Sequence, residues 1–310
     1  MTIRVGHVHG EHIAVEAAGG TEILRYVYRP DPQAFESRKP YAHPVRTLSG
    51  RTVTGYRPSD HRWHKGLQMT ASHLSGQNFW GGNCYVHGQG YRALPERVGS
   101  MRHDGFGEFT VGDDRLAFTE ELTWVANGGA EWARETRGLA VHSVDERAGA
   151  WALDWSIRLT NVHAEPLVFG SPTTAGRALA GYTGLQWRGP RDFTGGSAFA
   201  PDSDAGAGAE KLMGTQGPWL AFTTAHDEVD GHSTLVFAHA PENLDERTAI
   251  HASHWFVRCE PIPTAAFSWA FFEEFELPPG ESFAYRYRVV IADGAWDRER
   301  VAAHLEELPW

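Results

Sequence analysis

Apolar and polar residues alternate with a period of two over several long stretches of the chain. The clearest stretch carries a large apolar residue at every second position: Trp151, Leu153, Trp155, Ile157 and Leu159. The segments 114–125 and 281–294 repeat this pattern, and turn-forming glycine, proline, asparagine and aspartate residues separate the stretches. Such alternation predicts β-strands with one buried face.

Helical periodicity is scarce and is clearest at the C-terminus. There Asp297 can cap a helix that places Val301, Leu305 and Leu308 on one face. Many short strands with few helices are typical of all-β folds. We therefore predict a large antiparallel β-sandwich with a short C-terminal helix, one domain over residues 1–310, and a surface loop at 201–214.

The charge and composition of the chain limit which ligands it can bind and in which cellular compartment we expect it. The chain carries 28 Lys and Arg against 39 Asp and Glu, a net charge of -11, which disfavours nucleic acid and anionic membranes. Its most apolar run, 264–272, is far shorter than the ~20 residues that span a bilayer. With two cysteines and no signal-peptide pattern, we expect a cytoplasmic protein without a disulfide framework. Exposed edge strands would allow a homodimer.

The segment 57–67, "RPSDHRWHKGL", concentrates ionisable side chains beside a tryptophan. Pro58 and Gly66 bracket it and favour a loop, in which Asp60, His61 and His64 can converge. Three interpretations remain open: a metal site, a polar loop that binds a sugar or an acid, and a solvated turn. A metal site would need a further ligand from elsewhere in the chain.

The segment 249–263, "AIHASHWFVRCEPIP", repeats the pair of histidines spaced three apart beside a tryptophan and an arginine. A third segment, 181–193, "GYTGLQWRGPRDF", offers Tyr182, Arg188 and Arg191 to an anionic or polyhydroxylated ligand. Two similar clusters favour joint use, so we expect segments 57–67 and 249–263 to form one cleft.

Glu120 falls on the apolar face of its predicted strand, together with Phe118 and Leu122. A carboxylate in that position either borders a pocket or pairs with a buried arginine. Both interpretations are kept.

The segments 40–67, 184–196, 253–258 and 271–294 resemble a bacterial family labelled methane oxygenase, or PmoA-like. The overall pattern is also similar to the galactose-mutarotase-like β-supersandwich. The latter resemblance implies a sugar-binding histidine at His61 or His64 and a catalytic base at Glu260. The segment 159–177 departs from it, because Gly176 and Arg177 stand where the family has a catalytic histidine.

We therefore expect a carbohydrate-active enzyme that acts on a sugar or an oxidised sugar by acid/base chemistry, as an isomerase, lyase or hydrolase. The expected catalytic residues are His61, His64, Glu260 and His254. The expected substrate-binding residues are Asp60, Arg62, Trp63, Trp187, Arg188, Trp255 and Arg258, of which the arginines would stabilise negative charge and the tryptophans would stack on the ligand.

Two alternatives are kept beside this function. The expected enzyme needs no cofactor, but a metal-dependent enzyme could hold a divalent ion such as zinc on His61, His64 and His254. A non-catalytic sugar-binding protein would keep the sandwich without the chemistry.

Overall fold

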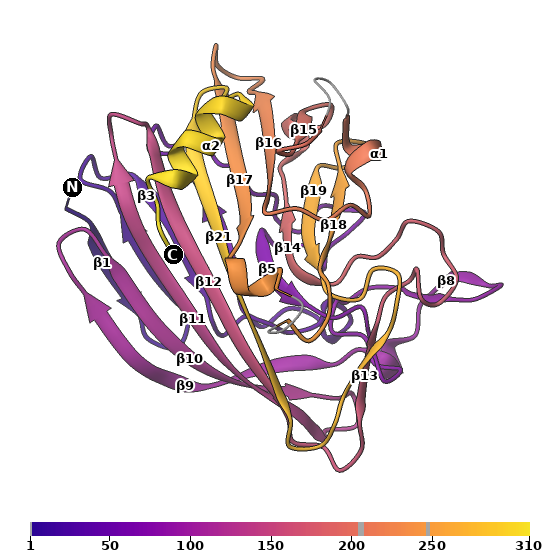
Figure 1. The fold of residues 1–310 in the computed structure, drawn as a ribbon. Coiled ribbons are helices and arrows are strands. Elements are labelled where there is room, and N and C mark those ends of the chain that lie inside the picture. The colour runs from indigo at the N-terminus through magenta and orange to yellow at the C-terminus, as the bar shows by residue number, and fades with distance from the viewer. Residues whose placement is uncertain (1, 204–207, 246–248) are drawn as a thin grey trace.

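Two eight-stranded antiparallel sheets pack face to face in the computed structural model, which describes residues 2–203, 208–245 and 249–310 (Figure 1). The first sheet has the strand order β1-β2-β3-β4-β5-β14-β19-β18, and the second has β15-β16-β17-β21-β12-β11-β10-β9. The predicted fold class, a large antiparallel β-sandwich, is confirmed.

The strands of the first sheet are β1 Arg4–Val8, β2 His12–Glu16, β3 Glu22–Val27, β4 Tyr41–Val45, β5 Leu67–Thr70, β14 Gly184–Arg188, β18 His254–Arg258 and β19 Thr264–Ser268. The strands of the second sheet are β9 Ser100–Val111, β10 Leu116–Val125, β11 Glu131–Asp145, β12 Ala150–Asn161, β15 Ser197–Phe199, β16 Trp219–Ala225, β17 His232–His239 and β21 Ser282–Asp293. Smaller sheets comprise β6 His73–Leu74, β13 Leu167–Gly170 and β20 Phe275–Leu277, and β7 Cys84–Val86 with β8 Gly90–Arg92. The helices are α1 Gly208–Leu212 and α2 Arg298–Glu306, with short 3-10 turns η1 Ala34–Glu36, η2 Pro95–Arg97, η3 Arg191–Phe193 and η4 Pro241–Asn243.

The predicted strands and the predicted C-terminal helix are present as β10, β12, β21 and α2. The Asp297 side chain caps α2 by accepting a hydrogen bond of 2.8 Å from the backbone N–H of Arg300. The helix lies across the outer face of the second sheet, where Val301 packs beside Val236 and Val290 (Figure 1). Part of the predicted loop 201–214 is the helix α1, and residues 204–207 lie outside the described residues. No helix of the described chain is long and apolar enough to cross a membrane.

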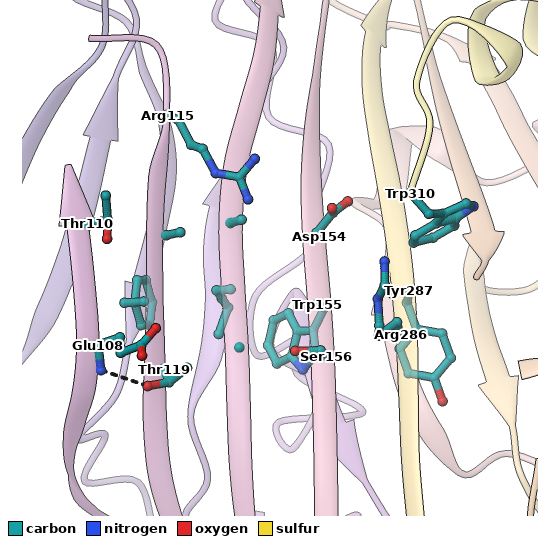
Figure 2. A pocket seen from close by; sticks show the side chains of 15 residues that line it. Glu108, Thr110, Arg115, Thr119, Asp154, Trp155, Ser156, Arg286, Tyr287 and Trp310 are labelled. Carbon is teal, nitrogen blue, oxygen red and sulfur yellow. Dashed lines mark hydrogen bonds between the residues drawn. The ribbon is translucent and has the colours of Figure 1, made fainter. Parts of the chain in front are cut away.

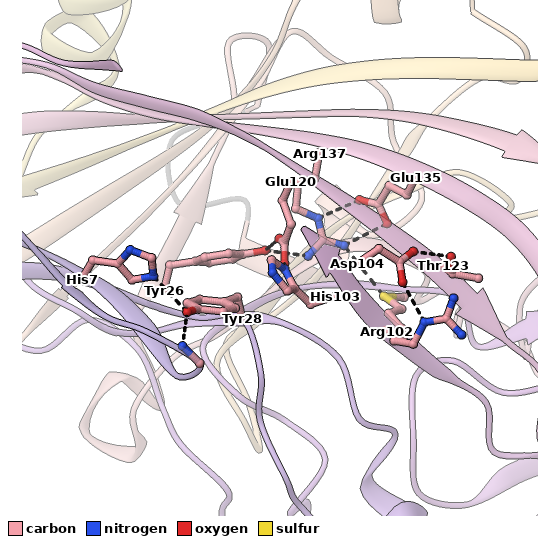
Figure 3. A network of polar contacts seen from close by, with 12 residues as sticks. His7, Tyr26, Tyr28, Arg102, His103, Asp104, Glu120, Thr123, Glu135 and Arg137 are labelled. Atoms are coloured by element: carbon pink, nitrogen blue, oxygen red, sulfur yellow. Dashed lines mark hydrogen bonds and ion pairs between the residues drawn. The ribbon is translucent and has the colours of Figure 1, made fainter. Parts of the chain in front are cut away.

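A chain of buried polar contacts joins the two sheets at one end of the sandwich (Figure 3). Arg137 on β11 forms two hydrogen bonds with Glu135, at 2.7 and 2.9 Å, and a third with the hydroxyl of Tyr26 on β3, at 3.1 Å. The Tyr26 hydroxyl donates to Glu120, whose other oxygen lies 2.7 Å from Nδ1 of His103.

Glu120 is therefore fully buried and reaches Arg137 through a tyrosine, rather than through a direct ion pair or at a pocket edge. Burial lowers the pKa of Arg137, but the contacts with Glu135, Tyr26 and Glu120 together raise it more, so the guanidinium keeps its proton. Arg137 is thus a positive charge shared by two buried carboxylates.

We predict that Arg137→Met lowers the free energy of unfolding by about 3–5 kcal/mol, because it leaves buried carboxylates without their cation. Urea denaturation followed by circular dichroism measures the change. Arg134→Met on the same strand is the matched control, because Arg134 is exposed and pairs with a partly exposed Glu131. Equal effects of the two substitutions would contradict a structural role for the network.

Candidate active site

The segment 57–66 forms a loop that crosses one end of the first sheet between β4 and β5. Its turns are held by backbone hydrogen bonds from His61 to Pro58, from His64 to His61 and from Arg57 to His64, each of 2.9 Å. The bracketing proline and glycine thus enclose a loop rather than a helix, as the sequence predicts.

A buried carboxylate, Glu36 at the end of η1, binds both ends of this loop. Arg57 donates two hydrogen bonds to it, at 2.6 and 2.9 Å, and the ammonium of Lys65 lies 3.0 Å from it. Burial raises the pKa of the Glu36 carboxyl, but the hydrogen bonds from Arg57 and Lys65 outweigh it, so the pKa lies below its ordinary value. Glu36 is therefore charged at neutral pH and fixes where the loop begins and ends.

Strand pairing brings the other two predicted segments to the same end of the sheet. Arg188 at the end of β14 pairs with Thr264 on β19, and Thr264 pairs in turn with Arg258 at the end of β18. The backbone N–H of Arg188 also donates to the carbonyl of Gly66, at 2.8 Å, which places β14 directly beside the loop.

Alternation along β14 and β18 decides which side chains face the cavity on the outer side of the sheet. Trp187 and Trp255 point inward into the core between the two sheets and are each only 1% exposed. Neither indole reaches the cavity, in contrast to the expectation that both stack on a ligand. Phe256 and Arg258 have the opposite parity on β18 and line the cavity.

The cavity has a volume of about 620 Å³ and is lined from both predicted clusters. Its polar and charged lining consists of Asp60, His61, His64, Asn83, Arg177, Arg191, Arg258 and Thr264. Its aromatic lining consists of Trp63, Trp80, Tyr91, Tyr182 and Phe256. Segments 57–67 and 249–263 thus share one cavity, through Asp60, His61, Trp63 and His64 on one side and Arg258 on the other.

The two histidines of the loop have different environments. His61 is partly exposed, and its Nδ1 lies 3.2 Å from the carboxylate of Asp60. Burial raises the pKa of Asp60, but the nearby His61 and the positive charge of Arg188 contribute to a net lowering, so this carboxylate is charged at neutral pH. An aspartate in this position orients the imidazole.

His64 is buried, and burial lowers its pKa well below the ordinary value, with the positive charges around it acting in the same direction. Its Nδ1 faces the guanidinium of Arg188 at 3.4 Å. A guanidinium can only donate, so Nδ1 is the acceptor and the proton of the neutral ring is on Nε2. Burial also lowers the pKa of Arg188, to about 10.

The indole of Trp63 is held against the backbone of the segment 81–82. A Cβ atom added to Gly82 would lie 2.3 Å from the Trp63 ring, so only glycine allows this contact. Of the three predicted stacking tryptophans, Trp63 is the one that lines the cavity.

Four other predicted site residues lie outside the lining of this cavity: Glu260, His254, Arg62 and Arg188, of which Arg188 contacts His64 instead. Glu260 lines a neighbouring hollow with Gly195 and Met213, although Arg258 borders both spaces. His254 packs against the rings of Phe271 and Phe272, with centroid distances of 5.9 and 5.1 Å. Arg62 is exposed and does not line the cavity.

The alternative metal set is not assembled in the described part of the chain. No three His, Cys, Asp or Glu side chains come together there in an arrangement that could hold an ion. His61 and His64 lie together, with ring centroids 4.9 Å apart, but His254 does not join them.

Sequence reasoning missed several cavity residues, among them Trp80, Tyr91 and Arg177. All three lie in loops or in the small β7–β8 hairpin, where periodicity gives no signal. Phe256 was within reach of sequence reasoning, because alternation in "SHWFVR" gives it the same parity as Arg258.

A second, shallower cavity of about 300 Å³ lies on the outer face of the second sheet (Figure 2). Asp154 is bound there by Arg288, at 2.6 Å, and Arg286 pairs with Glu242. Burial raises the pKa of Asp154, but Arg288 and His142 together bring it to about 2. Because these charges are compensated within the fold, the first cavity is the stronger candidate for a ligand site.

The chain belongs to DUF6807, a family of unknown function whose model matches residues 14–306. That family carries no assigned activity and gives no support to the methane-oxygenase label. No curated protein sequence matches the chain.

Several solved structures share a distant likeness of fold. The Slr1438 protein from Synechocystis sp. PCC 6803 is 10% identical, with a TM-score of 0.38 over 94% of this chain and 96% of that one. A protein described as an aldose 1-epimerase from Klebsiella pneumoniae is 13% identical, with a TM-score of 0.38 over 99% and 82%. A protein described as a kojibiose phosphorylase from the human microbiome is 10% identical, with a TM-score of 0.35, and this chain spans 34% of its length. Scores of this size assign no activity.

We predict that Glu36→Gln lowers the free energy of unfolding at pH 7 by about 3–5 kcal/mol, because Lys65 loses its buried counter-ion. The folded-state pKa of Glu36 lies below the ordinary 4.5, so its stabilisation is present above that pH and is lost as the pH falls through the folded value. Urea denaturation from pH 7 to pH 3 should therefore show the difference from the wild type shrinking in acid.

Glu22→Gln is the matched control for this substitution. Glu22 also binds two arginines, Arg25 and Arg46, but these pairs lie in a partly exposed position on the first sheet. We expect a much smaller effect there. A wild-type stability for Glu36→Gln would show that the loop does not depend on the buried carboxylate.

Proposed function

We propose that this protein is a carbohydrate-active enzyme and that the cavity beside loop 57–66 is its active site. The observation that carries the proposal is the convergence of Asp60, His61 and His64 with five aromatic rings and three arginines in one cavity of about 620 Å³. Aromatic faces stack on the C–H faces of sugar rings, while charged and polar groups bind the hydroxyls, and the volume suits a small ligand. The resemblance of the sequence to the mutarotase-like supersandwich agrees with this ligand class.

In the proposed mechanism, His61 transfers the proton. Its Nδ1 faces the Asp60 carboxylate, which leaves Nε2 to accept a proton from the substrate and to return it. The contact with Asp60 keeps the ring in one orientation for both proton transfers.

His64 and the arginines act as electrostatic partners in this scheme. The neutral His64 donates from Nε2 to a substrate oxygen, because Arg188 occupies its Nδ1. Arg258 stabilises the negative charge that develops on the substrate when His61 removes a proton. Isomerases, lyases and hydrolases all need such a set, and Glu260 and His254 take no part in it because they lie outside the cavity.

We predict that His61→Asn lowers kcat by about 10²- to 10⁴-fold, because a general acid/base is lost while the cavity is kept. Proton NMR of the purified protein with a panel of neutral aldoses, ketosugars and sugar acids identifies the substrate and measures the rate. Asp60→Asn should lower kcat less and change the pH dependence of the rate, since it removes only the partner of His61.

The control is His232→Asn, which removes an exposed histidine at the start of β17. It should leave turnover unchanged. Ligand binding without turnover of any sugar would overturn the enzymatic proposal in favour of a binding protein. Activity that is lost on dialysis against a chelator and restored by a divalent ion would favour the metal-dependent alternative.

A further inference from the structure

The charge of the cavity is opposite to that of the whole chain. The protein has a net charge of -11, yet Arg177, Arg191 and Arg258 line the cavity against one carboxylate, that of Asp60. Asp60 is already engaged with His61. Within the described residues, none of the three guanidiniums forms an ion pair with a carboxylate, and Nε of Arg258 is buried without a hydrogen-bond partner.

Two of these guanidiniums are held in place by aromatic rings. Arg177 lies over the ring of Tyr91, at 5.0 Å from its centroid, and donates to the Tyr91 hydroxyl, which is itself hydrogen-bonded to Tyr182 at 2.7 Å. Arg258 lies over the ring of Phe256, at 5.4 Å. Stacking fixes a guanidinium plane while leaving N–H groups on its edge free to bind an anion.

This arrangement is unfavourable without a counter-ion. Arg177 and Arg258 carry like charges and line the same cavity, so they repel each other. Burial lowers the pKa of Arg258, and the positive charge of Arg177 acts in the same direction. Burial also lowers the pKa of Arg188. The negative charge of Asp60 partly offsets this effect, and the positive charge of Arg191 lowers the pKa further. An anion between these arginines would replace repulsion by charge-assisted hydrogen bonds.

We infer that the ligand of this cavity is a carbohydrate that carries an anionic group, a carboxylate or a phosphate, bound by Arg258 together with Arg177 and Arg191. The inference rests on the proposed function and narrows its substrate class. The sugar ring would lie against Trp63, whose indole is fixed on Gly82, with His61 beside it.

Isothermal titration calorimetry with three probes that share one sugar ring tests the inference: D-glucose, D-glucuronate and D-glucose 6-phosphate, followed by the same set in the galacto series. We expect one charged probe to bind at least about tenfold more tightly than the neutral sugar, since hydrogen bonds to charged groups contribute about 1.5–3 kcal/mol. Tighter binding of the uronate identifies a carboxylate, and tighter binding of the sugar phosphate identifies a phosphate. Equal affinities for neutral and charged probes in both series would overturn the inference.

Arg258→Gln should lower the affinity for the charged probe by about ten- to a hundredfold and leave the affinity for the neutral sugar nearly unchanged. The matched control is Arg92→Gln on β8, which removes one exposed positive charge close to Tyr91 but outside the lining. Equal weakening of neutral and charged probes by Arg258→Gln would contradict the anion site. If Arg258→Gln is unstable, the comparison of neutral and charged probes on the wild-type protein still tests the inference.

The two proposals can fail separately. The protein could turn over neutral sugars and bind them as tightly as their charged counterparts. That result would overturn the anion inference and still support the proposed enzymatic function. Selective binding of a charged sugar without turnover of any sugar would support the anion site and overturn the proposed catalysis.

Discussion

The ion pairs of the buried Glu36 with Arg57 and Lys65 are the interactions on which the site depends. A charge in a protein interior is tolerated only when partners compensate it, and here both cations belong to the two ends of one loop. If the loop moved away from Glu36, the buried carboxylate would lose both of its cations. That constraint holds His61 and His64 at the edge of the cavity, although the loop itself contains few apolar anchors.

The second constraint is the pleat of the first sheet. Where β14 and β18 end beside the loop, alternate side chains enter either the core or the cavity. Trp187 and Trp255 stabilise the sandwich from inside, while Arg258 lines the cavity and Arg188 contacts His64. Stability and binding thus use neighbouring residues of the same strands, and the rigid core fixes the positions of the charged groups.

Much of the fold could be predicted from the sequence, because alternation and capping are local signals. β10, β12, β21 and α2 follow directly from them. The same rule separates Trp255 from Arg258 by parity, so the inward position of that tryptophan was also within reach. Arg177 could not be found in this way, because it lies in a loop between β13 and β14 and reaches the cavity only through tertiary packing. The direction of Glu260 likewise depends on the turn after β18, for which periodicity gives no rule.

We propose that a sugar with an anionic group lies between Trp63 and the arginines, within reach of His61. A crystal structure of the protein with the tightest-binding charged sugar tests it most directly. The anionic group should lie on Arg258 and Arg177, with the sugar ring against Trp63. A ligand bound instead on the outer face of the second sheet, beside Trp310, or an anionic group directed away from the arginines, would contradict it.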